Sequence, residues 1–273
     1  MRSTGGKPWL AGLALCALAR AAKADVPMPL DRFNLSLGEF YPTVDATVSA
    51  AGPRIAGTDI NFERDLNLDT HRTLPSLHLE FLVLDSQGFE ISGYQYSKNK
   101  RASLARSIDF EGTHYDINAF VQAGLRLYTY SATWRWWINP DVHDVFGFGL
   151  GGVYYDVKGT IEGGISVNTE SASAHGAAEA SATAPALTLD WRHAFSHDLR
   201  AYLDFVGVRK PSGSLTGHLL NATLGAEWYP FDNFGVALEY SSNDLDLKAQ
   251  RDEWTGRASI HFRGPAAFLR VRF

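Results

Sequence analysis

Three features of the 273-residue sequence predict an all-β chain that closes into an antiparallel barrel. Segments in which apolar and polar residues alternate recur along the chain, and this is the period of a half-buried strand. Short and long connections between these segments alternate, as in barrels that have short turns at one end and longer loops at the other. Aromatic residues gather beside the short turns, where a membrane interface selects them. No run of about 18 apolar residues follows the N-terminal region, which argues against a membrane-spanning helix.

The first 24 residues have the pattern of a secretory signal peptide. A basic start precedes a short apolar run over residues 10–18. Ala22-Lys23-Ala24 then offers small residues at both positions that a signal peptidase reads, so we predict cleavage before Asp25. A nine-residue apolar run is too short for an anchor helix. The predicted domains are a signal peptide over 1–24 and one barrel over 25–273.

Cleavage would change the charge and the cysteine content of the chain. It removes Arg2, Lys7, Arg20 and Lys23 and no acid, which leaves 21 Lys and Arg against 30 Asp and Glu, a net charge of about −9. So acidic a chain is a poor ligand for nucleic acid. Cleavage also removes Cys16, the single cysteine of the sequence, which suits export through an oxidising periplasm and excludes a disulfide scaffold.

Six segments carry the strand pattern. They are residues 32–48, 75–84, 120–137, 186–192, 199–205 and 219–228. In 199–205, for example, Leu203 and Phe205 face one way, and Arg200 and Asp204 face the other.

The connections set the topology. Four short turns lie near 85–88, 139–141, 196–198 and 231–233, and five longer connections lie near 49–72, 101–117, 159–184, 210–217 and 247–252. Together they join ten strands in a closed transmembrane barrel with both termini periplasmic, within a range of eight to twelve. The Gly, Ala and Ser content of 159–184 predicts a flexible loop rather than a plug.

The final strand contains a change of apolar parity. Phe262 and the apolar residues before it share one parity, whereas Leu269, Val271 and Phe273 share the other. Because a β-bulge shifts the facing of a strand by one residue, we interpret the change as a bulge at Gly264-Pro265.

The C-terminal residues Leu269, Val271 and Phe273 resemble the terminal signature of bacterial outer-membrane barrels. In those families the signature is recognised by the barrel-assembly machinery. The chain resembles the small barrels related to OmpA and OmpW. It is also similar to uncharacterised proteobacterial barrels with a stretch like 57–62 followed by one like 65–68. The resemblance implies the bacterial outer membrane as location and its lipids and lipopolysaccharide as partners, and we expect a monomer. Fold alone does not fix function.

Strand parity sends a nearly balanced set of charges into the lumen. The predicted network comprises Glu80, Glu90, Arg126, Asp190, Arg192, Arg200, Asp204, Glu227, Glu239, Arg257, His261, Arg263 and Arg270, with His78 and Arg272 on the same face. Opposite charges in a narrow barrel should pair, because an unpaired buried charge costs several kcal/mol. Two roles stay open: a structural barrel that the network fills, or a narrow conduit for small solutes with a continuous water path.

An enzyme acting on lipid or peptide at the outer rim is the alternative. Such a site needs a nucleophile or an activated water beside a base. His71, His114 and His175 lie on different predicted outer loops. No His stands two residues before a Ser, as in lipid A deacylases, and we find no loop that pairs His with Asp, as in outer-membrane proteases. We therefore predict no enzyme, no catalytic residue and no cofactor.

A calcium site is also not expected. Residues 65–69 begin like a calcium loop, but Thr70 replaces the required Gly, and Ser76 stands where the bidentate Glu belongs. A loose divalent-ion bridge from Asp59, Glu63 and the nearby acids to lipopolysaccharide phosphates stays open.

Overall fold

The computed structural model describes residues 28–52, 57–62, 64–65, 73–104, 107–110, 113–116, 120–139, 141–167, 170–250, 252 and 254–273. The signal peptide predicted over 1–24 lies outside these ranges. No helix in the described part of the chain is long and apolar enough to cross a membrane.

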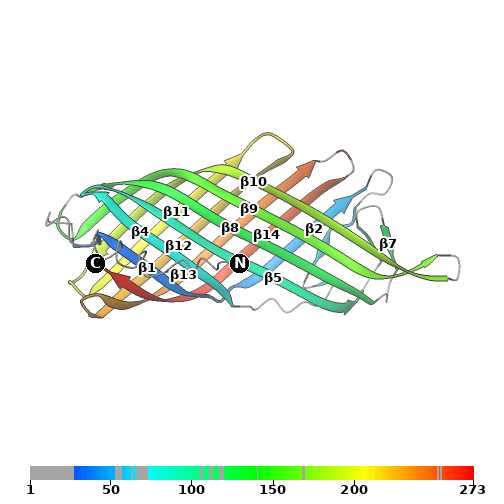
Figure 1. Cartoon of the computed structure of the whole chain (residues 1–273), viewed down its shortest axis with the longest axis horizontal. Coiled ribbons are helices and arrows are strands. Elements are labelled where there is room, and N and C mark those ends of the chain that lie inside the picture. Colours follow the sequence, from blue (N-terminus) through cyan, green and yellow to red (C-terminus); the bar gives the residue numbers. More distant parts are fainter. Residues whose placement is uncertain are drawn as a thin grey trace, which may run out of the picture.

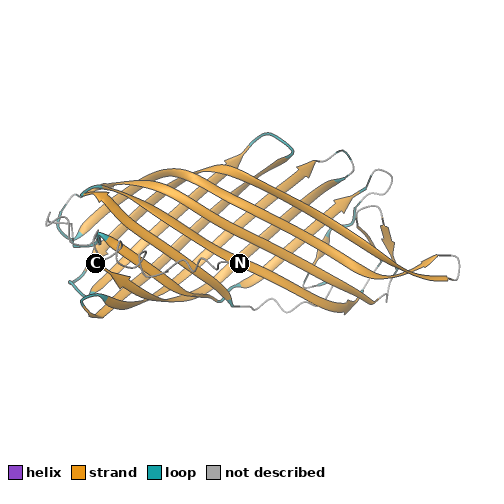
Figure 2. Cartoon of the chain, in the orientation of Figure 1, coloured by secondary structure: helices purple, strands orange, loops and turns teal. Residues whose placement is uncertain are grey.

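The strands form one closed antiparallel barrel (Figures 1 and 2). They are β1 (Phe33–Phe40), β2 (Thr43–Ala51), β3 (Ile60–Asn61), β4 (Leu74–Leu84), β5 (Gln87–Ser103), β8 (Phe120–Ile138), β9 (Asp144–Val167), β10 (Glu170–Ala194), β11 (Leu199–Lys210), β12 (Leu215–Phe231), β13 (Phe234–Gln250) and β14 (Thr255–Arg272). A separate hairpin joins β6 (Ile108–Phe110) to β7 (Thr113–Tyr115).

Closure comes from the pairing of β1 with β14. The last part of β14 pairs with β1 and its first part pairs with β2, so β1 and β2 occupy one position in the barrel. The short β3 pairs with β2 above β4. The prediction of a closed barrel of ten antiparallel strands is therefore confirmed.

The segment 159–184 is mostly strand, so the prediction of a flexible loop there is wrong. β9 and β10 pair continuously from Asp144 with His193 to Val167 with Glu170, and their hairpin projects farthest from the barrel end that carries the C-terminus (Figure 1). A strand of this length, tilted as in membrane barrels, reaches about 60 Å, against a membrane-facing belt of about 25 Å. The barrel therefore extends far above any membrane that it crosses. Composition misled because pairing, not intrinsic propensity, decides strand formation.

The outer face near the short turns is an apolar belt. Leu37, Leu189, Leu238 and Leu269 point outward from four strands, each more than half exposed. Rings border the belt on both sides. Those near the short turns include Trp136, Trp228, Phe231 and Phe234, and those at the upper edge are Tyr41, Tyr130, Tyr154 and Tyr240. Two aromatic girdles around an apolar band are the outer surface of a membrane-spanning barrel.

Two of the aromatic residues beside the short turns, which the sequence places at the membrane interface, lie inside the barrel instead. Trp137 and Tyr229 are 7% and 1% exposed. Their inward parity places them over guanidinium groups, Trp137 near Arg192 and Tyr229 near Arg272.

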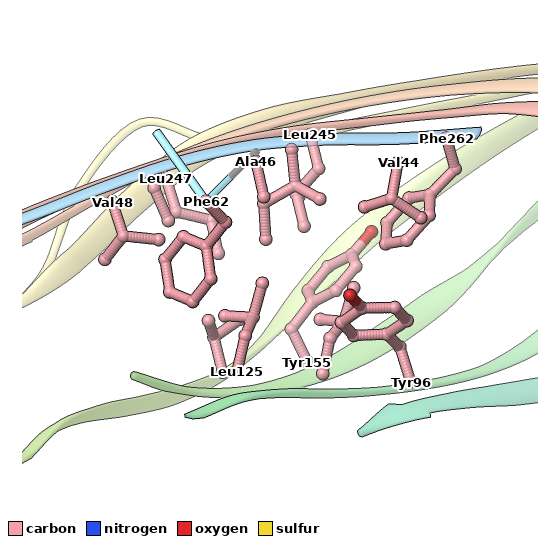
Figure 3. Close-up of a cluster of buried hydrophobic side chains, with 14 of the residues drawn as sticks. Val44, Ala46, Val48, Phe62, Tyr96, Leu125, Tyr155, Leu245, Leu247 and Phe262 are labelled. Atoms are coloured by element: carbon pink, nitrogen blue, oxygen red, sulfur yellow. The ribbon is translucent and has the colours of Figure 1, made fainter. Parts of the chain in front are cut away.

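Above the belt the two faces of each strand exchange their polarity. On β2, Asp45 and Thr47 face outward, while Val44, Ala46 and Val48 are buried in the lumen. Side chains from opposite walls meet there in one apolar cluster, to which Phe62, Tyr155 and Phe262 contribute (Figure 3). The outer wall contacts water at this height, so the apolar residues are buried inside.

β14 crosses both environments without a bulge. Tyr240 pairs with Pro265 and Ser241 pairs with Gly264, and the register continues unbroken on both sides. The predicted bulge at Gly264-Pro265 is therefore wrong. The apolar residues change from the inner to the outer face there, because the outer wall faces water before this point of the strand and the membrane after it.

Candidate functional site

A layer of ion pairs fills the lumen at the height of the belt. Arg192 of β10 donates two hydrogen bonds across the lumen to Glu80 of β4, at 2.9 and 2.7 Å. Arg135 of β8 contacts Glu90, lies 3.7 Å from Glu80 and 3.1 Å from Asp190. One guanidinium thus bridges carboxylates from three strands. The pair of Arg192 with Glu80, with two parallel hydrogen bonds, is the strong form of the interaction, since both partners are charged and oriented.

A second group of charges centres on Arg270 of β14. Its guanidinium contacts Glu227 of β12, lies 3.2 Å from Glu239 of β13 and donates to the hydroxyl of Tyr202 at 2.9 Å. The Tyr202 hydroxyl donates in turn to Glu239, and Arg270 lies over the Tyr202 ring. The side chain of Arg270 is 6% exposed and that of Glu227 is 4% exposed. The group joins β11 to β14 into one polar network.

The residues before β1 close the periplasmic end. Asp31 accepts a hydrogen bond from Arg200 at 2.8 Å, and its carboxylate lies 4.0 Å from Arg272. Leu30 packs beside Trp137 and Val145 in a small buried cluster. The chain therefore places one ion pair and one apolar side chain in the lower mouth of the barrel.

Glycines on inward positions make room for the large side chains of this layer. A Cβ added at Gly225 would lie 2.2 Å from the ring of Tyr202, and one at Gly149 would lie 3.0 Å from Cγ of Arg135. Both neighbours are buried; hydrogen bonds hold Tyr202 and ion pairs hold Arg135, so they have little freedom to move. The layer thus depends on small and large residues alternating between adjacent strands.

A polar cavity of about 140 Å³ separates the charged layer from the apolar cluster. Glu80, Glu90 and Arg270 line it on one side, and Tyr155 and Phe40 on the other. Hydroxyl pairs occupy its walls, including Ser92 with Ser131 at 2.7 Å and Thr223 with Ser241 at 2.8 Å. A volume of this size holds on the order of ten waters. From bottom to top, the lumen holds a charged layer, a polar cavity and an apolar cluster.

The structure brings most of the predicted lumen residues together. Those whose side chains lie in the lumen are Glu80, Glu90, Asp190, Arg192, Arg200, Asp204, Glu227, Glu239 and Arg270. His78 lies there too, 3.9 Å from Glu90, and Arg272 is 4% exposed near Asp31. The assignment of their strands' inward face is correct because these residues lie at belt height, where lipid fixes the apolar face outward.

Arg126, Arg257, His261 and Arg263 are not in the lumen, and their predicted placement is wrong. Arg126 lies on the outer wall, 3.3 Å from Asp156 and 3.2 Å from Glu179. His261 and Arg263 both contact Asp244 on the outer wall, and Arg257 is exposed. All lie above the belt, where the polar face is the outer one. The hydrogen bond from His261, with Arg263 nearby, lowers the pKa of Asp244.

Sequence reasoning missed Arg135, which is among the most connected charges of the layer. It shares its parity with the apolar residues Val121 and Leu127 of the same strand, so the alternation does not place it among the lumen charges. Asp31 was missed because it precedes the first strand. The available signal was the position of Arg135 between Trp134 and Trp136, which both point to the membrane.

A His does pair with Asp at the outer rim, contrary to expectation. In the β6–β7 hairpin, Nδ1 of His114 lies 2.6 Å from Asp109 and Nε2 lies 3.4 Å from Asp116. The hydrogen bond to Asp109 raises the pKa of His114. The sequence separation of five residues hid the pair, since a hairpin brings both ends together. No group of three or more His, Cys, Asp or Glu side chains that could hold a metal ion occurs among the described residues. Of the acids Asp59, Glu63, Asp65 and Asp69, which could form the ion bridge to lipopolysaccharide, Glu63 and Asp69 lie outside the described residues.

Comparison with known proteins gives the fold. No family model matches the sequence, and no curated protein matches it. The outer membrane protease OmpT from Escherichia coli superposes with a TM-score of 0.55 at 10% identity, over 93% of this chain and 99% of that one. A Pseudomonas aeruginosa FadL homologue (TM-score 0.41, 11% identity) covers 93% of this chain, with 94% of its own length matched. OprG from Pseudomonas aeruginosa (0.41, 9%) covers 91%, with 100% of its own length matched.

Identity of 10% with OmpT carries the architecture and no activity. The apolar belt with its two girdles supplies the membrane-facing surface that this architecture requires. The chain is therefore a bacterial outer-membrane β-barrel in fold.

Proposed function

We propose that this protein is an outer-membrane barrel with a closed lumen and a structural role. Its membrane-spanning part anchors the upper strands and the hairpins above the cell surface. The observation that carries the proposal is the apolar cluster across the upper lumen. Phe62, Tyr155 and Phe262 belong to this cluster of buried hydrophobic side chains (Figure 3). Ions do not cross a packed apolar region, because leaving water costs an ion many kcal/mol. The ion-pair layer below it is then a filling of the lumen rather than a path.

A solute-uptake assay tests this proposal. Proteoliposomes that contain the folded protein are placed in iso-osmotic solutions of small sugars and amino acids, and swelling is recorded. We expect swelling no faster than in protein-free liposomes. Swelling that depends on solute size would support the narrow channel instead.

The rival function is an enzyme at the outer rim, and the pair of His114 with Asp109 is the observation that favours it. A carboxylate that orients a His is part of many hydrolytic sites. We propose that this pair is a hairpin contact and that the protein is not an enzyme. His114→Ala should leave any peptide or lipid hydrolysis by purified protein at background. Hydrolysis by the wild type that His114→Ala abolishes would favour the enzyme.

The proposed partners follow from the fold. We propose that the barrel is a monomer, that it contacts outer-membrane lipids and lipopolysaccharide, and that the barrel-assembly machinery inserts it through β14 and the terminal Phe273. Leu269, Val271 and Phe273 lie on the outer face of that strand, where another protein or lipid can reach them.

A further inference from the structure

Two aspartates stand directly opposite each other in the charged layer of the lumen. Asp190 of β10 pairs with Asp204 of β11 in the register of these strands, and both point inward. Side chains at directly opposite positions have Cβ atoms about 4.5–5.5 Å apart. The carboxyl group of Asp204 lies within hydrogen-bonding reach of Asp190. Two carboxyl groups this close do not both ionise readily, because like charges repel strongly where little water screens them.

The other contacts of the two carboxyl groups differ. Thr188 donates to Oδ2 of Asp190 at 3.2 Å, and Nη2 of Arg135 lies 3.1 Å from Oδ1 of Asp190. Oδ1 of Asp204 is buried, and within the described part of the chain no hydrogen bond and no ion pair reaches it. Asp190 therefore has the surroundings of a carboxylate. Asp204 has those of a neutral acid, which needs an acceptor for its proton.

The charges at this height of the barrel do not balance. Among the described residues, the guanidinium groups of the lower lumen are the five of Arg135, Arg192, Arg200, Arg270 and Arg272. The carboxyl groups beside them are the seven of Asp31, Glu80, Glu90, Asp190, Asp204, Glu227 and Glu239. Each of these carboxyl groups except that of Asp204 forms an ion pair with an arginine. Excess negative charge inside a barrel is costly unless a proton or a cation neutralises it.

The surroundings of the two aspartates supply little compensation. Gly147 of β9 lies beside Asp190, and Thr223 of β12 stands opposite Asp204, so two of the neighbouring positions are uncharged. The charged and titratable groups that face the two aspartates are Glu80 of β4, Glu90 of β5, Arg135 of β8, Arg192 of β10 and Tyr202 of β11, with the group around Arg270 beyond Tyr202. Of these described groups, Arg135 forms the ion pair with Asp190 and bridges to Glu90 as well.

We propose that Asp190 and Asp204 bind one proton between them at neutral pH. Asp204 carries the proton and donates it in a hydrogen bond to Asp190, which stays ionised beside Arg135. Asp204 also lines the polar cavity, so its proton exchanges with water held there. The bound proton neutralises one of the excess negative charges of the lumen. This inference goes beyond the proposed structural role and does not depend on whether the apolar cluster closes the upper lumen.

The dependence of stability on pH tests the site. In the unfolded chain an aspartate is ionised above its ordinary pKa of about 3.9, so at neutral pH folding takes up one proton. The stability that this proton confers is greatest at low pH and is lost as the pH rises. From about pH 6 to about pH 8, the folding equilibrium constant of the wild type should fall about tenfold per pH unit relative to that of Asp204→Asn. The amide of this variant donates to Asp190 without taking up a proton. Urea unfolding of the full-length barrel in detergent micelles measures both constants.

Glu227→Gln is the matched control. It also neutralises one acid of the lumen, but it takes that acid from an ion pair with Arg270. We expect Glu227→Gln to lower the folding equilibrium constant at every pH and to keep the pH dependence of the wild type. If Asp204→Asn destabilises the barrel as much as Glu227→Gln and keeps the same pH dependence, Asp204 is an ionised partner of the network and the proposal is overturned.

Infrared spectroscopy of the wild type gives a test that does not need either variant to fold. A protonated carboxyl group has a carbonyl stretching band separate from the bands of a carboxylate. We expect such a band in the folded wild type at neutral pH and its loss in Asp204→Asn. A wild type without the band would overturn the proposal. So would a wild type that sodium or potassium chloride stabilises more than N-methylglucamine chloride of equal ionic strength, with no such effect in Asp204→Asn, because a cation would then occupy the site.

Discussion

At the residue scale, ion pairs of the same chemistry contribute differently to stability, depending on whether they lie in the lumen or on the outer wall. The pair of Arg270 with Glu227 is buried in the lumen, whereas Arg126 contacts Asp156 on the outer wall with its side chain 33% exposed. Removing one partner of a buried pair leaves a charge without compensation. Removing one partner of an exposed pair leaves a charge that water solvates.

Glu227→Ala and Arg126→Ala should therefore have very different effects on stability. We expect Glu227→Ala to lower the free energy of unfolding by about 3–5 kcal/mol, since Arg270 and Tyr229 both lose their contact with it. Arg126→Ala should cost less than about 1 kcal/mol. Urea unfolding of the barrel in detergent micelles, followed by tryptophan fluorescence, measures both. Equal costs would contradict the placement of Arg126 outside.

At the element scale, one strand carries two opposite polarity patterns without a break in its register. On β14, Ile260 and Phe262 are buried in the lumen, while Leu269 and Phe273 are exposed on the belt. The strand therefore contributes to the apolar cluster at one end and to the membrane surface at the other. Truncating a side chain at one end of the strand should therefore affect stability, and truncating one at the other end should affect assembly.

Phe268→Ala and Phe273→Ala separate packing from assembly. Phe268 is 4% exposed inside the barrel, and its truncation leaves a cavity, so we expect a loss of about 3–5 kcal/mol in urea unfolding. Phe273 is 52% exposed, so its truncation should cost less than about 1 kcal/mol in vitro but strongly lower the folded amount in cells. Gel migration with and without boiling quantifies folded barrel in cell envelopes. The reverse order of effects would remove the assembly role of Phe273.

The β6–β7 hairpin should be sensitive to pH through His114. Its pKa is raised in the folded hairpin by the hydrogen bond to Asp109, with Asp116 nearby. A raised pKa stabilises the fold below the ordinary histidine pKa of about 6.5, and this contribution is lost as the pH rises through the raised value. The effect should be small because the pair is solvated.

Hydrogen exchange of residues 108–115 measures this dependence, after correction for the intrinsic rate. We expect stronger protection at about pH 5.5 than at about pH 8.5 in the wild type. Asp109→Asn should remove the difference. An unchanged difference in Asp109→Asn would assign it to another group.

At the scale of the whole molecule, the strand number and the charged layer could be predicted because both follow from period two at belt height. The inward face of the upper strands could not be predicted, because alternation shows that a strand has an apolar and a polar face but does not show which of the two faces the lumen. Val121 and Leu127 on β8 have the same pattern as a lipid face, yet they are buried inside. The informative signal was that several strands change their apolar parity at similar height, which a bulge in each strand would not explain.

The most direct test of the central claim, that the apolar cluster closes the lumen, is single-channel conductance in planar bilayers. We compare the wild type with F62A/F262A, which removes two rings from the cluster, and with the control Leu238→Ala on the belt. The account predicts no steady current for the wild type and the control, and stepwise current for F62A/F262A, because water enters the emptied region above the polar cavity. A wild type that conducts steadily, with no increase in F62A/F262A, would contradict the account.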